Sequence, residues 1–509
     1  MTESRVKAFF NGKNVFLTGG TGFVGIALVE KLLRTTNVNK VYLLLRTKKG
    51  KDISERLEEF KKNAIFERLV NEKGSDVFGK LVPVAGDVGE PNLGLSDSDT
   101  MILTENVNVM FHSAATLDFG ANLKSTVQIN LLGTRRVVEL CKKIRHLNAL
   151  LHVSSAFVNS HMLKPQEEFY PVHKTADEVI DFVEKSTDDQ IEEKTKLFLG
   201  EYINTYTFTK ALAEQEVRNA SSSFPTCIVR PSMITASWKE PVKGWTNSKN
   251  GPQGFIMGAG KGVVRRLPVN ENLIADYIPV DIVVNGMIVG AWHAATVMPA
   301  ETPVFHLTSS TSNPFRWRLI TPMLDELLHN SPLKSAVWYP CLKLVPSLFW
   351  FKVSALIFHW LPAYILDGVT KLMGGKTILV RMHTNIDKSL VQLKAFIFTE
   401  WLYDNKKTLS LHNSLNDEDK ESFNLDVTSL DWLDYFQWLA KGVRVYLHND
   451  PMSTVEKARK KDQMLRWFNL AIQGVFVAVV WFLYTMLTGT TFRGTLFMVP
   501  LVLSIISVL

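Results

Sequence analysis

The chain has 509 residues, of which 46% are hydrophobic and 21% are charged, and its formal net charge at pH 7 is +7. That length favours two or three domains. The Lys and Arg residues are scattered among acidic residues, which argues against a nucleic-acid-binding protein. The three cysteines (Cys141, Cys227 and Cys341) are far apart in the sequence and form no metal spacing. We therefore expect reduced thiols in a reducing compartment.

A glycine-rich run follows the first apolar segment, residues 14–17, and precedes an amphipathic pattern over residues 26–34. The run consists of Thr18, Gly19, Gly20, Thr21, Gly22, Phe23, Val24 and Gly25. Strand, glycine turn and helix in this order predict a dinucleotide site with the phosphates at the helix N-terminus. Gly19 would make the tight turn, Gly22 would admit the pyrophosphate, and Gly25 would let the helix pack on the strand. An ordinary turn between strand and helix is the alternative.

Short apolar segments alternate with helical patterns over residues 14–155. This alternation predicts an α/β fold with a doubly wound parallel sheet, the extended Rossmann type. A charged stretch, residues 164–201, carries two weak helical patterns and interrupts the fold as an insertion. A further helix is expected from residues 277–281 onward. The predicted strands are Val15–Leu17, Lys40–Leu45, Leu81–Ala85, Val109–His112, Leu150–Val153 and, after the insertion, Thr226–Arg230.

The residue that follows the second strand predicts the cofactor. Arg46 stands there, followed by Lys48 and Lys49. A guanidinium binds a ribose 2′-phosphate well, whereas an NAD site usually places Asp or Glu at this position. We therefore expect NADPH, with an ordinary solvated basic loop as the alternative. Farther on, Asp87 is expected to accept from the adenine amine, and the small side chain of Ala114 to let the cofactor backbone pass.

Tyr206 and Lys210 are four residues apart, so on a helix they share one face. A nearby ammonium lowers the pKa of a phenol, so Tyr206 could protonate the oxygen formed when a hydride reaches a carbonyl carbon. Lys210 could also bond the cofactor ribose. Ser155 ends the strand Leu150–Val153, at the edge where ligands bind to a parallel sheet. It is our candidate for holding the carbonyl oxygen, with Ser154 as the second choice and a serine in a plain turn as the alternative.

Metal chemistry and thiol catalysis are not expected. The residues His112, Asp118 and His161 fall near the predicted site but have no ligand spacing. Cys227 lies in a strand-like run without an adjacent histidine, which indicates buried packing rather than a nucleophile.

The C-terminal part of the chain predicts contact with a membrane. Trp467 to Leu487 has no charged residue and is long enough to cross a bilayer, and a basic cluster precedes it. The positive-inside rule then keeps the preceding chain in the cytosol, and residues 1–5 show no secretory signal. The apolar run Leu496 to Leu509 is only marginally long enough to span. The aromatic segment Trp338 to Leu366 is broken by prolines and lysines, and is either a membrane-interface segment or a buried helical hairpin.

The glycine spacing, with the Tyr206 and Lys210 pair, resembles the extended short-chain dehydrogenase/reductase superfamily. That resemblance implies that Asn130 orders a water or the lysine. It also implies that Pro231 and Met233 belong to the segment over the nicotinamide, with plain core packing as the alternative. Several motifs further resemble eukaryotic fatty acyl-CoA reductases, although Ser155 stands where many relatives have threonine. These are residues 18–25, 42–46, 153–159, 206–214 and 228–232, with residues 432–446 similar to that family's C-terminal helical domain.

The family resemblance implies a reaction in which a long-chain acyl-CoA, two NADPH and two protons give a primary alcohol, CoA and two NADP+. It also implies three parts: a reductase domain over residues 1–330, a helical domain over 331–455, and a basic flank with a transmembrane tail over 456–509. The expected partners are the acyl-CoA and membrane lipid, without nucleic acid, and the chain is compatible with a homo-oligomer. A tail anchor in the peroxisomal membrane is favoured over the endoplasmic reticulum. The alcohols would supply ether lipids or waxes.

Two other functions are compatible with parts of the sequence. A membrane-bound hydroxysteroid dehydrogenase/isomerase would share the cofactor residues and the Tyr206 and Lys210 pair, but the C-terminal helical region disfavours it. A non-catalytic NADPH-binding scaffold would not need Ser155, Tyr206 or Lys210.

Overall fold

The computed structural model describes residues 3–47, 50–489, 493–497 and 500. Its contacts divide the chain into two compact units that are interleaved along the sequence. The first unit comprises Met1–Ser248, Ile274–Phe315 and Thr399–Tyr435, and the second comprises Lys249–Leu273, Arg316–Phe398 and Phe436–Leu509. The contiguous domain boundaries expected near residues 330 and 455 stay a prediction.

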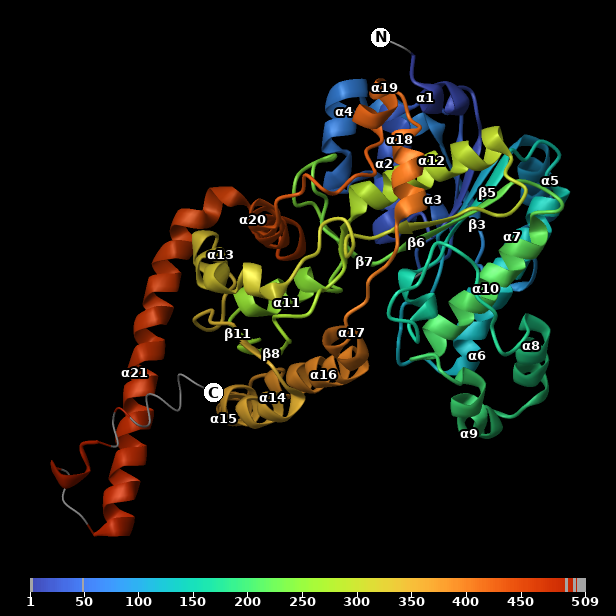
Figure 1. The fold of residues 1–509 in the computed structure, drawn as a ribbon. Helices are drawn as coiled ribbons and strands as arrows, with labels where there is room; N and C mark the ends of the chain where they lie inside the picture. Colours follow the sequence, from blue (N-terminus) through green and yellow to red (C-terminus); the bar gives the residue numbers. More distant parts are fainter. Residues whose placement is uncertain (1–2, 48–49, 490–492, 498–499, 501–509) are drawn as a thin grey trace. The chain divides into compact units, whose positions relative to one another are not determined.

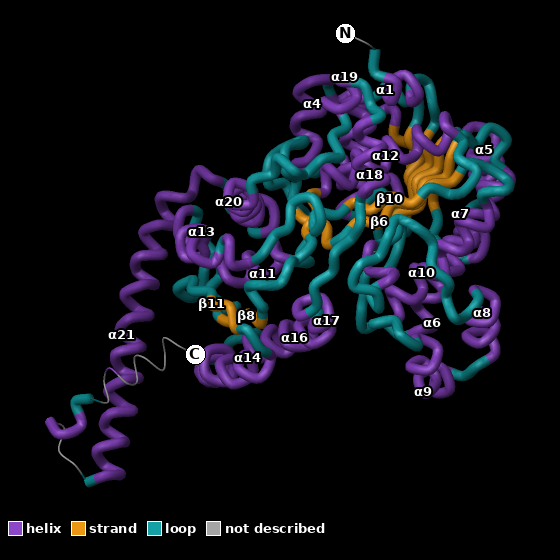
Figure 2. The backbone as a smooth tube through the Cα atoms, viewed as in Figure 1, coloured by secondary structure: helices purple, strands orange, loops and turns teal. Residues whose placement is uncertain are grey.

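A seven-stranded parallel sheet forms the centre of the first unit (Figure 2). Its strand order is β10-β6-β5-β4-β1-β2-β3, so the predicted doubly wound sheet is confirmed. The six strands expected from the sequence are all present, within a residue of the expected bounds. The strands are β1 Val15–Thr18, β2 Val41–Leu45, β3 Leu81–Ala85, β4 Val109–His112, β5 Ala149–Val153, β6 Thr226–Pro231 and β10 Val304–Leu307, with the small pair β7 Met233–Thr235 and β9 Tyr277–Pro279 beside them.

Helices cover both faces of this sheet (Figure 1). On one side α2 and α12 pack against each other, and α12 also contacts β5 and β6; on the other, α7 packs against α10 and β4. The helices of this unit are α1 Arg5–Phe10, α2 Phe23–Thr35, α3 Ile53–Lys61, α4 Glu67–Lys73, α5 Asp97–Asn106, α6 Leu123–Thr126, α7 Leu132–Lys143, α8 Ala176–Lys185, α9 Asp188–Leu199, α10 Thr205–Ala220, α12 Val280–Val297, α18 Lys406–Asn413 and α19 Asp417–Ser422.

The central strands are apolar on both faces because both faces are covered by helices. Every residue of β1, β4 and β5 is buried, as expected for strands inside a parallel sheet. Phe16, Met110 and Leu150 from these strands belong to one core with Val137 of α7 and Val217 of α10. This packing fixes the carboxyl ends of the strands, where the predicted site residues stand.

The charged insertion forms two helices, α8 and α9, as its sequence pattern suggests. Each begins with a capping box, Thr175 with Glu178 and Thr187 with Gln190. The apolar side of the insertion contributes Val179 to a second core. The insertion therefore packs on the unit that holds the sheet rather than forming a separate domain.

The second unit is mostly helical. Its elements are α11 Pro252–Gly260, α13 Leu324–Asn330, α14 Leu348–Ala355, α15 Leu361–Leu372, α16 Leu379–Gln392, α17 Lys394–Phe398 and α21 Val455–Thr488, with the short strands β8 Arg266–Pro268 and β11 Lys343–Val345, while α20 Trp432–Gly442 begins in the first unit and ends in the second.

Among the described residues, three helices are long and apolar enough to cross a membrane. Val280–Val297 has 78% of its apolar window buried and is the core helix α12, whereas in Met452–Thr488, which includes α21, only 11% is buried. The third, Leu348–Leu372, joins α14 and α15 through a π-helical turn, and 28% of its window is buried. This exposure disfavours the buried hairpin. The expected second apolar run, 496–509, lies mostly outside the described residues.

Candidate functional site

The glycine run forms a tight turn at the carboxyl end of β1. Gly19 has a φ of +74°, and a Cβ there would lie 2.7 Å from the backbone nitrogen of Ala114. A Cβ on Gly25 would lie 2.2 Å from the carbonyl oxygen of Gly19. The loop therefore packs against the end of β4 on one side and against its own helix on the other. These are the close approaches expected for Gly19 and Gly25, and they leave no room for a side chain at either position.

The helix that follows the glycine run can accept a phosphate. Gly22 is the N-cap of α2 and provides no capping side chain, and the first turn, which starts at Phe23, holds no acidic residue. The first N–H groups of a helix lack intrahelical partners and carry the positive end of its dipole. Thr21 and Gly22 are exposed, while Val24 is buried and Phe23 stacks on Trp245 at 5.5 Å. The residues present therefore fit a dinucleotide pyrophosphate.

Arg46 and Asp87 meet at the carboxyl ends of β2 and β3. Arg46 Nη1 lies 3.4 Å from Asp87 Oδ2, and both side chains are partly solvent-exposed. Asp87 Oδ1 also accepts from the backbone N–H of Gly89 at 2.9 Å. The guanidinium thus lies at the same end of the sheet as the glycine turn. Lys48 and Lys49 of the predicted basic loop lie outside the described residues.

Ser155, Tyr206 and Lys210 are all buried next to this edge of the sheet. Ser155 follows β5 and caps a short helical turn by accepting from the N–H of Phe157 at 3.3 Å. Tyr206 and Lys210 lie on α10, as predicted, and the phenol is hydrogen-bonded with Ser155. The tertiary structure thus brings together residues that are separated by the insertion. Ser154 is also buried, but its hydroxyl has no partner among the described residues.

The ammonium of Lys210 contacts β5 rather than the phenol. Lys210 Nζ donates to the carbonyl oxygen of Val153 at 2.6 Å and lies 3.3 Å from His152 Nε2. Burial raises the pKa of Tyr206 to about 12, opposed by its hydrogen bond with Ser155. Burial also lowers the pKa of Lys210 to about 8, opposed by the charge of Glu214. The pKa of Tyr206 is therefore raised here rather than lowered as the sequence suggested, because desolvation outweighs the hydrogen bond with Ser155.

Two buried histidines lie beneath the site; the sequence predicted His112 near it, whereas His152 was not predicted. Thr18 Oγ1 lies 2.8 Å from His112 Nδ1 and also accepts from the N–H of Ala114 at 3.3 Å. The ring of His112 is 5.1 Å from that of His152. Burial, with the charge of Lys210, holds the pKa of both histidines well below 6.5. In the sequence, each histidine is only a polar residue within an apolar strand. Hydrophobic periodicity and strand propensity do not assign a role to such a residue.

Asn130 lies in a π-helical turn, Val127–Leu131, and is fully buried. Its Oδ1 accepts from the N–H of Thr116 at 2.9 Å, and its Nδ2 donates to the hydroxyl of Thr209 at 3.2 Å. The amide therefore ties the loop after β4 to α10. It does not contact Lys210 directly, because the ammonium is turned toward β5.

The segment expected over the nicotinamide leaves the sheet at the same edge. Pro231 ends β6 and is buried, while Met233 opens β7 and is half-buried. Between these positions and α10, Arg230 forms a buried ion pair with Glu214, with Nη2 to Oε2 at 2.7 Å. The position of the segment is therefore coupled to the helix that carries the tyrosine and lysine.

No group of three or more His, Cys, Asp or Glu residues in the described part of the chain is placed to hold a metal ion, and the absence of a metal stays a prediction. Cys141 and Cys227 are buried thiols whose pKa is raised by burial, and Cys341 is half-buried. Cys227 lies inside β6, where a nucleophile would have no access.

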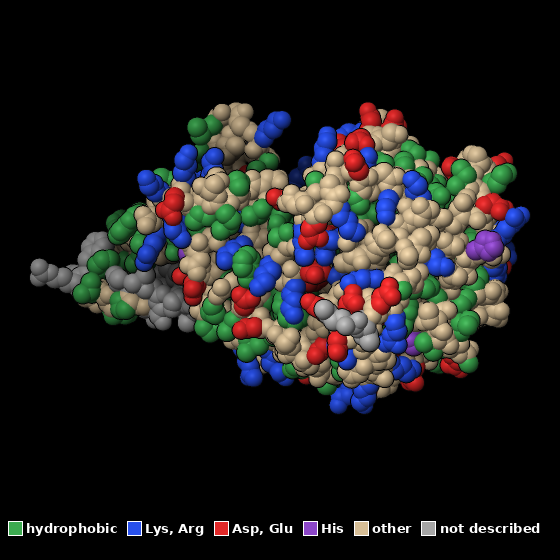
Figure 3. All heavy atoms as spheres, turned by 90° about the horizontal axis from the view of Figure 1, so that it is seen from above, with side chains coloured by type: hydrophobic (Ala, Val, Ile, Leu, Met, Phe, Trp, Pro, Cys, Tyr) green, Lys and Arg blue, Asp and Glu red, His purple; other side chains and the backbone are tan. Residues whose placement is uncertain are grey.

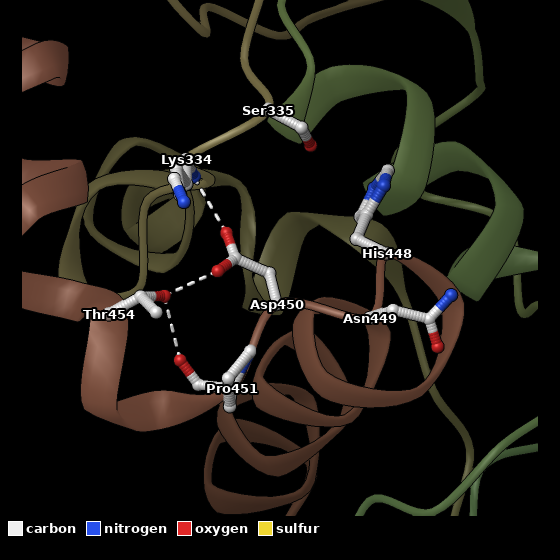
Figure 4. A pocket seen from close by; sticks show the side chains of 7 residues that line it. All are labelled: Lys334, Ser335, His448, Asn449, Asp450, Pro451 and Thr454. Atoms are coloured by element: carbon white, nitrogen blue, oxygen red, sulfur yellow. Dashed lines mark hydrogen bonds between the residues drawn. The ribbon is translucent and has the colours of Figure 1, made fainter.

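A small open pocket in the second unit, about 290 Å³, is lined by residues outside this constellation (Figure 4). Asp450 accepts from the N–H of Lys334 at 2.7 Å and pairs with Arg444 at 3.2 Å. Thr454 also bonds this carboxylate. Because these groups satisfy one another, they hold a turn before α21. On the surface drawn in Figure 3, basic and acidic side chains are interspersed, as the scattered charges of the sequence suggest.

Comparisons with protein-family models and solved structures indicate the class of protein. A domain model with the label NAD-binding, described as male sterility protein, matches residues 17–287, and the Sterile model of the same description matches residues 358–450. The terminal R domain of the myxalamid PKS-NRPS pathway matches with a TM-score of 0.54 at 20% identity, covering 88% of this chain and 92% of that chain. The R domain of a non-ribosomal peptide synthetase from Mycobacterium tuberculosis matches with a TM-score of 0.54 at 18% identity, covering 86% and 92%. The fold and the matched domain model thus define a protein with a Rossmann-type NAD(P)-binding domain.

Relatives with high coverage narrow the class. A Drosophila melanogaster protein named "Putative fatty acyl-CoA reductase CG8306" is 50% identical over 98% of each chain. Fatty acyl-CoA reductase 1 of Rattus norvegicus is 34% identical, and that of Homo sapiens 33%, each over 94% of this chain and 92% of the relative. The chain belongs to the fatty acyl-CoA reductase family.

Proposed function

We propose that this protein reduces long-chain fatty acyl-CoA to the primary alcohol with two NADPH, through a bound aldehyde, and releases CoA. The observation that carries the proposal is the constellation of Ser155, Tyr206 and Lys210, buried together beside the glycine turn. The names of the relatives support the acyl-CoA substrate. A binding scaffold would need none of these three side chains in this place.

The chain's own residues account for the proton and oxygen chemistry. NADPH, when bound, supplies the hydride. Ser155 and Tyr206 hydrogen-bond the carbonyl oxygen, and Tyr206 donates the proton that this oxygen takes up as the hydride reaches carbon. The positive charge of Lys210 favours loss of that proton from the phenol. Burial of all three side chains excludes water, which protects a reactive aldehyde.

The reaction consists of two successive reductions of the same carbon. The first hydride and proton convert the thioester to a hemithioacetal, whose C–S bond breaks to give the aldehyde and CoA thiolate. The thiolate takes the hydroxyl proton. The second hydride and proton convert the aldehyde to the alcohol. In sum, acyl-CoA, two NADPH and two protons give the alcohol, CoA and two NADP+.

Arg46 supports NADPH over NADH. It is the first residue after β2 and is kept in place by Asp87. A guanidinium gains charge-assisted hydrogen bonds from a 2′-phosphate and has little to gain from a 2′-hydroxyl. In our proposal Asp87 has a double role, positioning Arg46 and accepting from the adenine.

We further propose a tail anchor through α21, with the reductase domain in the cytosol and the peroxisomal membrane as its location, and alcohols that supply ether lipids or waxes. The long exposed apolar window of Met452–Thr488 and the basic residues before it support this orientation. Imaging a fluorescent fusion of residues 455–509 tests the location. A reticular rather than punctate pattern would assign it to the endoplasmic reticulum.

A product assay tests the reaction. Detergent-solubilised full-length protein is given acyl-CoAs of several chain lengths with NADPH, and separately with NADH, and the products are identified by mass spectrometry. We expect long-chain alcohol with two NADPH consumed per alcohol. Accumulated aldehyde would mean a single reduction, and binding of NADPH without turnover of any acyl-CoA would overturn the proposal.

A further inference from the structure

Many large apolar side chains of the helical segment Leu348–Leu372 are exposed on its surface. The side chains of Phe349, Leu356, Ile365 and Leu372 are each more than half exposed, and Leu372 is 90% exposed. Soluble helices place such residues against a core. A contiguous apolar surface of this kind marks an interaction site.

Polar side chains on the opposite side of the same segment fix this orientation. His359 is buried, and its Nε2 accepts from the N–H groups of Arg265 and Arg266 at 3.0 and 3.1 Å. Asp367 is buried and accepts from three N–H groups over Ile378–Val380, at 2.9 to 3.2 Å. Rotating the helix to bury its apolar side would break these bonds. The outward position of the apolar side is therefore built into the second unit.

The charge around the apolar side has one sign. Between residues 331 and 386 the single acidic residue is Asp367, which is buried. The basic residues Lys352, Lys371, Lys376 and Arg381 in the same region are exposed. An apolar face bordered by cations fits the surface of a bilayer with anionic headgroups.

We propose that Leu348–Leu372 lies in the plane of the membrane, with its apolar side among the upper acyl chains of an anionic leaflet. The same unit contains α21, which has the length and composition of a membrane span, so a bilayer is available to it. The segment does not cross the bilayer, because Lys352 and the buried His359 and Asp367 would have to enter the hydrocarbon with their protein partners. The chain would then contact the membrane at two separate places.

Site-specific fluorescence in the full-length chain tests this. In a Cys341→Ser background, a cysteine placed at Leu356, Ile365 or Leu372 is labelled with an environment-sensitive dye, and the protein is reconstituted in phosphatidylcholine and phosphatidylserine vesicles. The lipids carry bromine either near the headgroup or near the chain end. Leu197, exposed on α9, is the water control, and Val475, exposed on α21, is the bilayer control.

We expect all three probes to be blue-shifted and quenched most strongly by bromine near the headgroup. Unquenched, water-like emission, as at position 197, would overturn the proposal. So would strongest quenching by deep bromine, as at position 475, because the segment would then span. A blue shift without quenching would indicate a second protein copy instead. Replacing Lys371 and Lys376 by Glu should lower the quenching at position 372. Unchanged quenching would overturn the proposed attraction to anionic headgroups.

A separate observation concerns His152, which lies on β5 beneath Lys210. An ammonium has no acceptor, so at 3.3 Å His152 Nε2 must accept its proton and the ring must be neutral with hydrogen on Nδ1. That Nδ1 has no hydrogen-bond partner among the described residues, and the ring is fully buried. The charged or titratable groups facing it are Lys210 from α10 and His112 from β4. The ring contributes one bond, and that bond is to Lys210.

We propose that His152 is a positioning residue that holds the Lys210 ammonium at the carboxyl end of β5. This inference rests on the proposed reductase function. Its test compares His152→Phe, His152→Gln and His152→Asn in the full-length protein. The glutamine amide can reach the place of Nε2, whereas the asparagine amide reaches only that of Nδ1.

We expect His152→Phe and His152→Asn to lower kcat about tenfold or more, corresponding to about 1.4 kcal/mol, and to move the basic limb of the pH–rate profile to lower pH. His152→Gln should restore both. Equal loss of kcat in the His152→Gln and His152→Phe variants would overturn the inference. So would a lower kcat without a shift in the basic limb of the pH–rate profile. Absence of turnover in the unchanged protein would instead overturn the proposed function.

Discussion

Arg230 and Glu214 form a bidentate, buried ion pair, with Nε to Oε1 at 2.9 Å and Nη2 to Oε2 at 2.7 Å, that ties β6 to α10. Glu214 is one helical turn beyond Lys210, and Arg230 is next to Pro231. The pair therefore fixes α10, which carries the proposed Tyr206 and Lys210, relative to the strand that leads to Pro231. Its removal would affect both the stability of the fold and the geometry of the site.

Replacing Glu214 by Gln should lower the free energy of unfolding by about 3–5 kcal/mol, because it leaves the Arg230 charge buried without a counter-ion. Denaturant unfolding measures this change. Glu72→Gln removes the exposed pair with Arg68 and should change stability by about 0–1 kcal/mol. Equal effects of the two substitutions would mean that the buried pair has no special role.

Replacing Tyr206 by Phe should lower turnover by about 10²–10⁴-fold, the usual contribution of a general acid, while NADPH affinity is kept. Tyr202→Phe is the matched control, since Tyr202 is also buried and its pKa is also raised to about 12. Single-turnover rates and cofactor titration separate the two quantities. Turnover that survives in the Tyr206 variant would exclude this phenol as the proton donor.

The rate should fall as pH rises through about 8, because Lys210, whose pKa burial lowers to about 8, then loses the charge that favours proton loss from the phenol. Below that pH the lysine is charged and the rate is on its plateau. Lys210→Arg keeps its charge throughout, so any residual activity should lack this limb. A limb that persists in the arginine variant would have to arise from another group.

Replacing Arg46 by Glu should weaken NADPH binding by about 10- to 100-fold, the equivalent of about 1.5–3 kcal/mol for hydrogen bonds to a charged group. NADH binding should not weaken. Arg145→Glu is the control, because Arg145 is an exposed arginine that precedes β5, at the opposite edge of the sheet. Fluorescence titration with NADPH and with NADH measures the two affinities. A parallel loss of NADH affinity would show a general disturbance of the site.

Replacing Gly25 by Ala should destabilise the turn by about 1–3 kcal/mol and weaken cofactor binding, since the new Cβ would overlap the Gly19 carbonyl. Gly79→Ala serves for comparison, because no atom lies within 4 Å of a Cβ there. Thermal unfolding with and without NADPH measures both effects. A Gly25 variant that binds normally would show that the backbone of the turn can relax.

The sequence by itself determined the Rossmann sheet, the glycine turn, the pairing of Tyr206 with Lys210 on one helix, and the apolar tail helix. These features are local: they depend on period, on glycine spacing and on apolar length, which a chain carries before it folds. Only the tertiary structure decided which groups the Lys210 ammonium contacts, because Val153 and His152 lie on a strand about sixty residues away in the sequence. The tertiary structure also decided which side of the helical segment Leu348–Leu372 is exposed. By sequence alone, its apolar residues could equally have faced a core. Their exposure depends on the hydrogen bonds of His359 and Asp367 to backbone N–H groups, which no local sequence pattern encodes.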